Sequence, residues 1–153
     1  MKQLRRLLVT DAAERTVLLQ ALPLLILVRV SLWMLPLHRV HDASSALLTR
    51  VARPRRKGGL PPERITWLVT VASRLVPRAH CLIRAIVAQY LLARSGHLAD
   101  LRIGVRKDGG TLDAHAWLVL DGRPLFEDDE HLEDYTPFEN FFTSSRDLGN
   151  PSS

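Results

Sequence analysis

Residues 81–128 decide the fold, and they read CLIRAIVAQYLLARSGHLADLRIGVRKDGGTLDAHAWLVLDGRPLFED. In the first fourteen of these residues apolar side chains recur every three to four positions, which predicts a helix, and Gly96 follows it as a C-terminal cap. From residue 101 the repeat changes to two, which is typical of a strand. A second strand is expected over 112–120 and a third over 124–128, each after a turn that contains glycine.

Three further helices are predicted upstream. The apolar run 17–28 predicts a helix capped by Thr10 or Asp11, residues 43–51 predict a short helix capped by Asp42, and residues 64–75 predict a third. Helices followed by antiparallel strands predict an α+β domain, in which the helix that begins at Cys81 packs on a small antiparallel sheet.

Composition excludes several classes of site. The chain has 153 residues and one cysteine, so it has neither an internal disulfide nor a zinc site built from several thiolates. No nucleotide-binding glycine motif is present, and we expect no cofactor and no metal. Residues 1–57 carry a net charge of +8 and residues 108–153 carry −9. The basic part favours either a solvated surface or an anionic partner, such as nucleic acid or lipid.

The apolar stretch over residues 17–37 raises the question of a membrane segment. Its uninterrupted run ends before Arg29, which is short of the roughly 20 residues that a membrane span needs. No cleavage site typical of a signal peptide follows it. We therefore expect a helix that is buried or faces a partner rather than a lipid-bound one, in a cytoplasmic protein.

The lone cysteine, Cys81, stands at the start of the best-marked helix. A helix N-terminus carries unpaired N–H groups and a partial positive charge, both of which favour a thiolate. Arg78 and Arg84 are expected to act in the same direction. The alternative is an inert buried thiol.

His115 lies in the second strand and shares a face with Trp117, which we expect to be turned towards the core. A carboxylate from the next strand can hold its imidazole. A hairpin loop of two or four residues pairs His115 with Asp128, and a loop of three residues pairs it with Glu127. A thiol, a histidine and a carboxylate so arranged are typical of a cysteine acyl-transfer enzyme.

The segments 81–85, 92–96, 103–105 and 114–124 resemble the transglutaminase-like (papain-superfamily) proteins of lasso-peptide biosynthesis. The resemblance implies a papain- or transglutaminase-like fold with Cys81 as nucleophile and His115 as general base. The third member of the family's triad lies twelve residues after the histidine, commonly as aspartate, and this chain has Glu127 there. The triad is then Cys81, His115 and Glu127, with Asp128 and Asp121 as alternatives.

The resemblance also implies the organisation and partners of the protein. Residues 1–60 form a helical region for docking or core packing, residues 61–140 the cysteine-protease core, and residues 141–153 a flexible tail. The implied activity is removal of the leader from a precursor peptide, with a small leader-recognition protein and an ATP-dependent cyclase as partners. The alternative functions are those of a non-catalytic scaffold, a binder of nucleic acid or anionic membrane, and an amidase or transglutaminase that uses the same residues.

Overall fold

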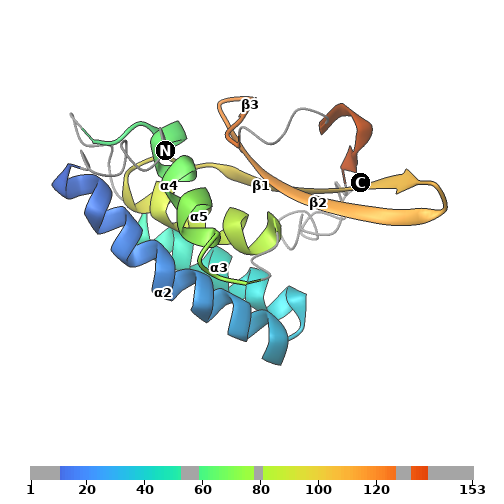
Figure 1. Cartoon of the computed structure of the whole chain (residues 1–153), viewed down its shortest axis with the longest axis horizontal. Helices are drawn as coiled ribbons and strands as arrows, with labels where there is room; N and C mark the ends of the chain where they lie inside the picture. Colours follow the sequence, from blue (N-terminus) through green and yellow to red (C-terminus); the bar gives the residue numbers. More distant parts are fainter. Residues whose placement is uncertain (1–10, 53–58, 78–80, 127–131, 138–153) are drawn as a thin grey trace, which may run out of the picture.

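The computed structural model describes residues 11–52, 59–77, 81–126 and 132–137. Helices lie against one another and against one end of an antiparallel sheet, whose first hairpin extends beyond them (Figure 1). This arrangement confirms the predicted α+β fold. The elements are α2 (Ala12–Met34), α3 (Leu37–Val51), α4 (Pro62–Ser73), α5 (Cys81–Arg94), β1 (Asp100–Asp108), β2 (Thr111–Leu120), β3 (Arg123–Pro124), η1 (Leu132–Asp134) and β4 (Thr136–Pro137).

The helix boundaries follow the capping signals at α2 and α5 but not at α3, and α4 begins and ends two residues before the predicted range 64–75. The Asp11 side chain accepts a hydrogen bond from the Ala12 amide at 2.7 Å, so the predicted cap of α2 is confirmed. α5 begins and ends as predicted, and Gly96 beyond it has a φ of 85°. The predicted start of α3 is wrong: the helix begins after Pro36, whose extended backbone forms the N-cap, and Asp42 therefore lies inside it.

The hydrophobic core joins the N-terminal helix to the rest of the domain. Ala21 and Leu25 of α2 are fully buried together with residues of α4, α5 and β2. An ion pair between Glu14 and Arg64 (Nε–Oε1, 2.5 Å) also links α2 to α4. The N-terminal helical region therefore contributes directly to core packing.

The sheet has the strand order β3-β2-β1-β4 and is antiparallel throughout. Asp121 and Gly122 both have positive φ values, 50° and 79°, and form a two-residue turn between Leu120 and Arg123. Such turns match the twist of a β-hairpin. The third strand is shorter than predicted, and the fourth, β4, joins the far side of β1 without a sequence signal.

Alternation along β2 separates the core from the face that carries His115. Ala116 and Leu118 belong to the hydrophobic core. Successive side chains of a strand point to opposite faces, so His115 and Trp117 lie on the other side of the sheet. The prediction that their face is turned towards the core is therefore wrong, although Trp117 is still buried, because Tyr135 packs beside it.

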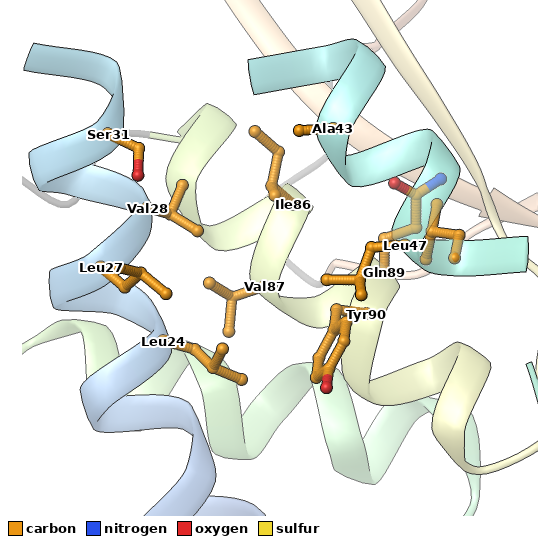
Figure 2. A pocket seen from close by; sticks show the side chains of 11 residues that line it. Leu24, Leu27, Val28, Ser31, Ala43, Leu47, Ile86, Val87, Gln89 and Tyr90 are labelled. Atoms are coloured by element: carbon orange, nitrogen blue, oxygen red, sulfur yellow. The ribbon is translucent and has the colours of Figure 1, made fainter. Parts of the chain in front are cut away.

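The outer side of α2 is exposed and apolar. We call its exposed side chains the α2 stripe: Leu19, Ile26, Leu27, Val30, Trp33 and Met34. A hollow lies on each side of the stripe. One separates α2 from α3 and α5, with Leu24, Val28 and Val87 directed into it (Figure 2). The other lies between α2 and the chain at Leu75–Pro77. α2 is also long and apolar enough to cross a membrane, a test of length and composition that core helices of soluble proteins and signal sequences pass as well.

We expect the core side of α2 to be essential and its outer side to be tolerant. Leu25 is 0% exposed and Leu19 is 73% exposed in the same helix. Replacing Leu25 by alanine removes buried methyl groups and should lower the free energy of unfolding by about 2–5 kcal/mol. The matched change Leu19→Ala should alter it by about 0.5 kcal/mol or less. Urea denaturation measures both, and equal losses would contradict the assignment of the two faces.

Candidate active site

Cys81 is the first residue of α5 and lies at an edge of β2. Its thiol is directed at the carbonyl oxygen of Ala114, with the two heavy atoms 3.9 Å apart. Alternate residues of a strand present their backbone groups to the same edge. Leu118 uses that edge to accept a hydrogen bond from the Leu125 amide at 3.0 Å, so β2 meets β3 there. At Ala114, four residues before Leu118, the same edge of β2 meets the start of α5.

The structure brings the sulfur of Cys81 and the imidazole of His115 into hydrogen-bonding contact. Burial raises the pKa of the Cys81 thiol. This effect is outweighed by the hydrogen bond to His115, a hydrogen bond to the backbone of Ala116, the charge of His115 and the backbone of Leu82, so the pKa falls below its ordinary value of 9.0. The lowered pKa increases the fraction of Cys81 that is thiolate at a given pH.

The groups that lower the Cys81 pKa differ in part from those expected. The prediction that the helix start favours the thiolate agrees with the contribution of the Leu82 backbone. Arg84, expected to act on the thiol, has its guanidinium carbon 5.4 Å from the centre of the Phe126 ring. Arg78 lies outside the described residues. Among the described groups, the largest causes that lower the Cys81 pKa are His115 and the backbone of β2.

The three candidates for the third catalytic member stand differently. Asp121 lies in the turn six residues beyond His115, about 20 Å along an extended strand, which is too far for a hydrogen bond to the imidazole. Glu127 and Asp128 lie outside the described residues. The turn observed between Leu120 and Arg123 has two residues, and for a loop of that length the hairpin register predicts that His115 lies opposite Asp128. Which of the two carboxylates acts with His115 stays a prediction.

A cluster that sequence reasoning missed surrounds the outer side of His115. The imidazole centre lies 6.1 Å from the Trp117 ring, nearly parallel to it, and 5.4 Å from the Tyr135 ring. The Tyr135 hydroxyl donates a hydrogen bond to Asp113 at 2.7 Å, and Arg106 contacts the same carboxylate at 3.4 Å. This hydrogen bond raises the pKa of Tyr135, so the phenol stays protonated.

Gly104 makes room for this cluster. It is paired with His115 across β1 and β2. A Cβ at this position would lie 2.9 Å from the Trp117 ring, closer than real Cβ contacts come, and 3.0 Å from the Tyr135 Cβ, which is tighter than most of them. Glycine is therefore required by the close approach of the two aromatic side chains.

Metal binding finds no support among the described residues. No group of three or more histidine, cysteine, aspartate or glutamate side chains is placed to hold an ion there. The side chains of His38 and His41 lie outside the part of the structure that is described, as do His80 and His131. What the described geometry offers chemically is a thiol with a lowered pKa, an imidazole hydrogen-bonded to it and backbone N–H groups at the start of a helix.

Comparison with known proteins agrees with this geometry. The profile of the transglutaminase-like superfamily matches residues 22–140, which include the second half of α2 and every element of the candidate site. No curated protein and no solved structure matches the chain significantly. The match covers more than half of the sequence and extends the similarity well upstream of Cys81. The chain belongs to the transglutaminase-like superfamily.

Proposed function

We propose that this protein is a cysteine peptidase that removes the leader from a ribosomally made lasso-peptide precursor, acting with a separate leader-recognition protein in the cytoplasm. The observation that carries the proposal is the hydrogen-bonded pair of Cys81 and His115, in which the thiol pKa is lowered. Membership of the superfamily supports cysteine-dependent acyl chemistry. The choice of a lasso-peptide precursor rests on the resemblance of residues 81–124.

The reaction uses the two side chains in turn. His115 holds the proton of Cys81 while the thiolate attacks the carbonyl carbon at the junction between leader and core. As the tetrahedral intermediate collapses, the carbon–nitrogen bond breaks and His115 gives its proton to the departing amine. Water then attacks the thioester, His115 takes a proton from it, and the leader leaves with a free carboxylate while the thiol is restored.

The start of α5 supports stabilisation of the developing oxyanion. The first N–H groups of a helix have no partner within the helix, and they carry a partial positive charge. Cys81 occupies the first position of α5, so its own amide stands at the helix end for a substrate oxygen, while the Leu82 amide is hydrogen-bonded to the sulfur. In this proposal the nucleophile and the oxyanion site are supplied by the same helix end.

The α2 stripe is the surface that we propose for the leader-recognition protein. Its six apolar side chains include Trp33, which is 87% exposed, and it is bordered by a hollow on each side. The α2 stripe forms a ridge between these two hollows, and such a surface packs better against the side chains of another protein than against a flat lipid layer. The net charge of +8 over residues 1–57 favours an acidic rim on that partner.

The thiol should titrate at a lower pH in the folded protein than in the unfolded one. The chain has a single cysteine, so its rate of alkylation by iodoacetamide reports on Cys81 alone. We expect the midpoint of the rate–pH curve to lie below that of the protein in urea, where the value approaches 9.0. His115→Ala should move the midpoint upwards.

The same shift has a defined effect on stability. A thiol with a lowered pKa stabilises the folded state at pH values above its unfolded pKa, and this contribution disappears as the pH falls through the folded value. If the rate–pH curves of alkylation had the same midpoint for the folded and the unfolded protein, the proposed activation of the Cys81 thiol would be contradicted.

Cleavage of a leader-containing precursor should require both residues of the pair. Cys81→Ser and His115→Ala should each reduce the rate by at least about a thousandfold, because each removes a participant in the same covalent step. Leu112→Ala, at an exposed position in β2, is the matched control and should retain activity. Mass spectrometry of the products distinguishes hydrolysis from transfer to an amine.

The third member can be assigned in the same assay. Asp128→Asn and Glu127→Gln each remove one charge, and the variant with the larger loss identifies the carboxylate that acts with His115. Undiminished cleavage by Cys81→Ser would exclude the peptidase and favour a scaffold. Salt-dependent binding of nucleic acid that Cys81→Ser leaves unchanged would favour the alternative function of a nucleic-acid binder.

Binding of the leader-recognition protein should depend on the α2 stripe. The double change Leu27→Ser and Trp33→Ser should weaken the complex by roughly thirtyfold, as expected for central interface residues. Leu112→Ser removes an equally exposed leucine from another face and should leave the affinity unchanged. Titration calorimetry with the purified partner measures both. Stripe-dependent binding to anionic vesicles, or a self-association that the double change abolishes, would overturn this assignment.

A further inference from the structure

We propose that Tyr135 is a positioning residue for His115: its ring limits the orientations of the imidazole, and its hydroxyl is anchored to Asp113 so that the ring is held in place. The inference rests on the proposed function, because it assigns Tyr135 a role in preparing the Cys81–His115 pair. It concerns a residue from outside the hairpin, contributed by the segment between η1 and β4.

The imidazole lies beside two aromatic rings on the outer face of the sheet, and the centres of these two rings are themselves 6.4 Å apart. Trp117 follows it on the same strand face, and its ring lies at 15° to the imidazole plane. Tyr135 lies closer, with ring centres 5.4 Å apart and planes tilted by 39°. An aromatic face attracts a positive charge, so the protonated imidazole is favoured beside these rings. A charged His115 in turn favours the Cys81 thiolate.

Tyr135 is itself held from several sides. Its hydroxyl donates to Asp113 Oδ2 at 2.7 Å, and the Arg106 guanidinium lies 5.0 Å from its ring centre. Arg106 also pairs with Asp113 at 3.4 Å and with Asp134 at 3.8 Å. The charged groups that face Tyr135 therefore come from β1, β2 and η1. Opposing charges in one network fix the phenol more firmly than a single exposed pair would.

The backbone supports the same placement. Thr136, the next residue, pairs with Val105 in the antiparallel contact of β4 with β1. This pairing sets Tyr135 at the edge of the sheet beside Gly104, where the absence of a Cβ leaves space for its side chain. The pairing of the two-residue strand β4 with β1 thus places the Tyr135 ring beside the imidazole of His115.

The test measures the rate of Cys81 alkylation against pH and the pH dependence of precursor cleavage. Tyr135→Leu removes the ring and should raise the alkylation midpoint and reduce cleavage at neutral pH by roughly tenfold or more. Tyr135→Phe keeps the ring but loses the hydrogen bond, and should cost about twofold to tenfold. The matched control is Tyr90→Phe, the same change at the other tyrosine of the chain, which should leave both curves unchanged.

A double-mutant cycle separates positioning from a merely structural role. If the hydroxyl acts through Asp113, Tyr135→Phe should shift the midpoint in the wild-type background and have no effect in Asp113→Ala. Asp113 is exposed, so this variant is expected to fold even if Tyr135→Leu does not. Equal shifts in both backgrounds, or a Tyr135→Leu variant that is less stable but titrates like the wild type, would overturn the proposal.

The outcome for Tyr135 is distinguishable from that for the proposed function. If wild-type Cys81 titrates like an ordinary thiol, the peptidase assignment fails and the positioning role fails with it. If wild-type Cys81 is activated and every Tyr135 variant matches it in both curves, only the positioning role fails.

Discussion

The start of α5 meets the edge of β2, and the chemistry of the site depends on this contact. Backbone groups of Ala114 and Ala116 lie at the Cys81 sulfur, and the His115 side chain between them forms a hydrogen bond with it. The edge of a strand normally offers its hydrogen bonds to another strand. Here β3 uses one part of it and a helix start uses the other, so the Cys81 thiol is positioned by backbone geometry as much as by side chains. Any change that extended the third strand along this edge would compete directly with the thiol.

The helix and the first hairpin could be predicted because their signals are local. The bounds of α5 follow from apolar spacing, and the turns of the sheet follow from glycines that adopt positive φ values. Once the two-residue turn after Leu120 is known, the register of β2 and β3 is determined. The pairing of Arg106 with Asp113 could have been found in the same way, because the turn at Gly109 and Gly110 sets the two residues opposite each other. Local patterns therefore predicted most of the scaffold and the two elements that bring Cys81 and His115 together.

Other features depend on contacts that leave no periodic signal. α3 begins at an extended proline rather than at a polar capping side chain, so the search for caps placed its start too late. β4 is two residues long and joins β1 from a distant part of the chain, and no pattern in so short a segment reveals it. Tyr135 reaches the site only through that strand. The face of His115 was also misjudged, because Trp117 is buried by an aromatic neighbour rather than by the main core.

The single cysteine of the chain has a consequence for its chemistry in air and under oxidative stress. A thiolate reacts with peroxides far more readily than a thiol, and the product is a sulfenic acid. Such an acid is commonly rescued when a neighbouring thiol condenses with it to form a disulfide. This chain has no second thiol to offer. Recovery of an oxidised molecule therefore depends on a reductant from its surroundings, such as a small-molecule thiol able to reach the end of α5.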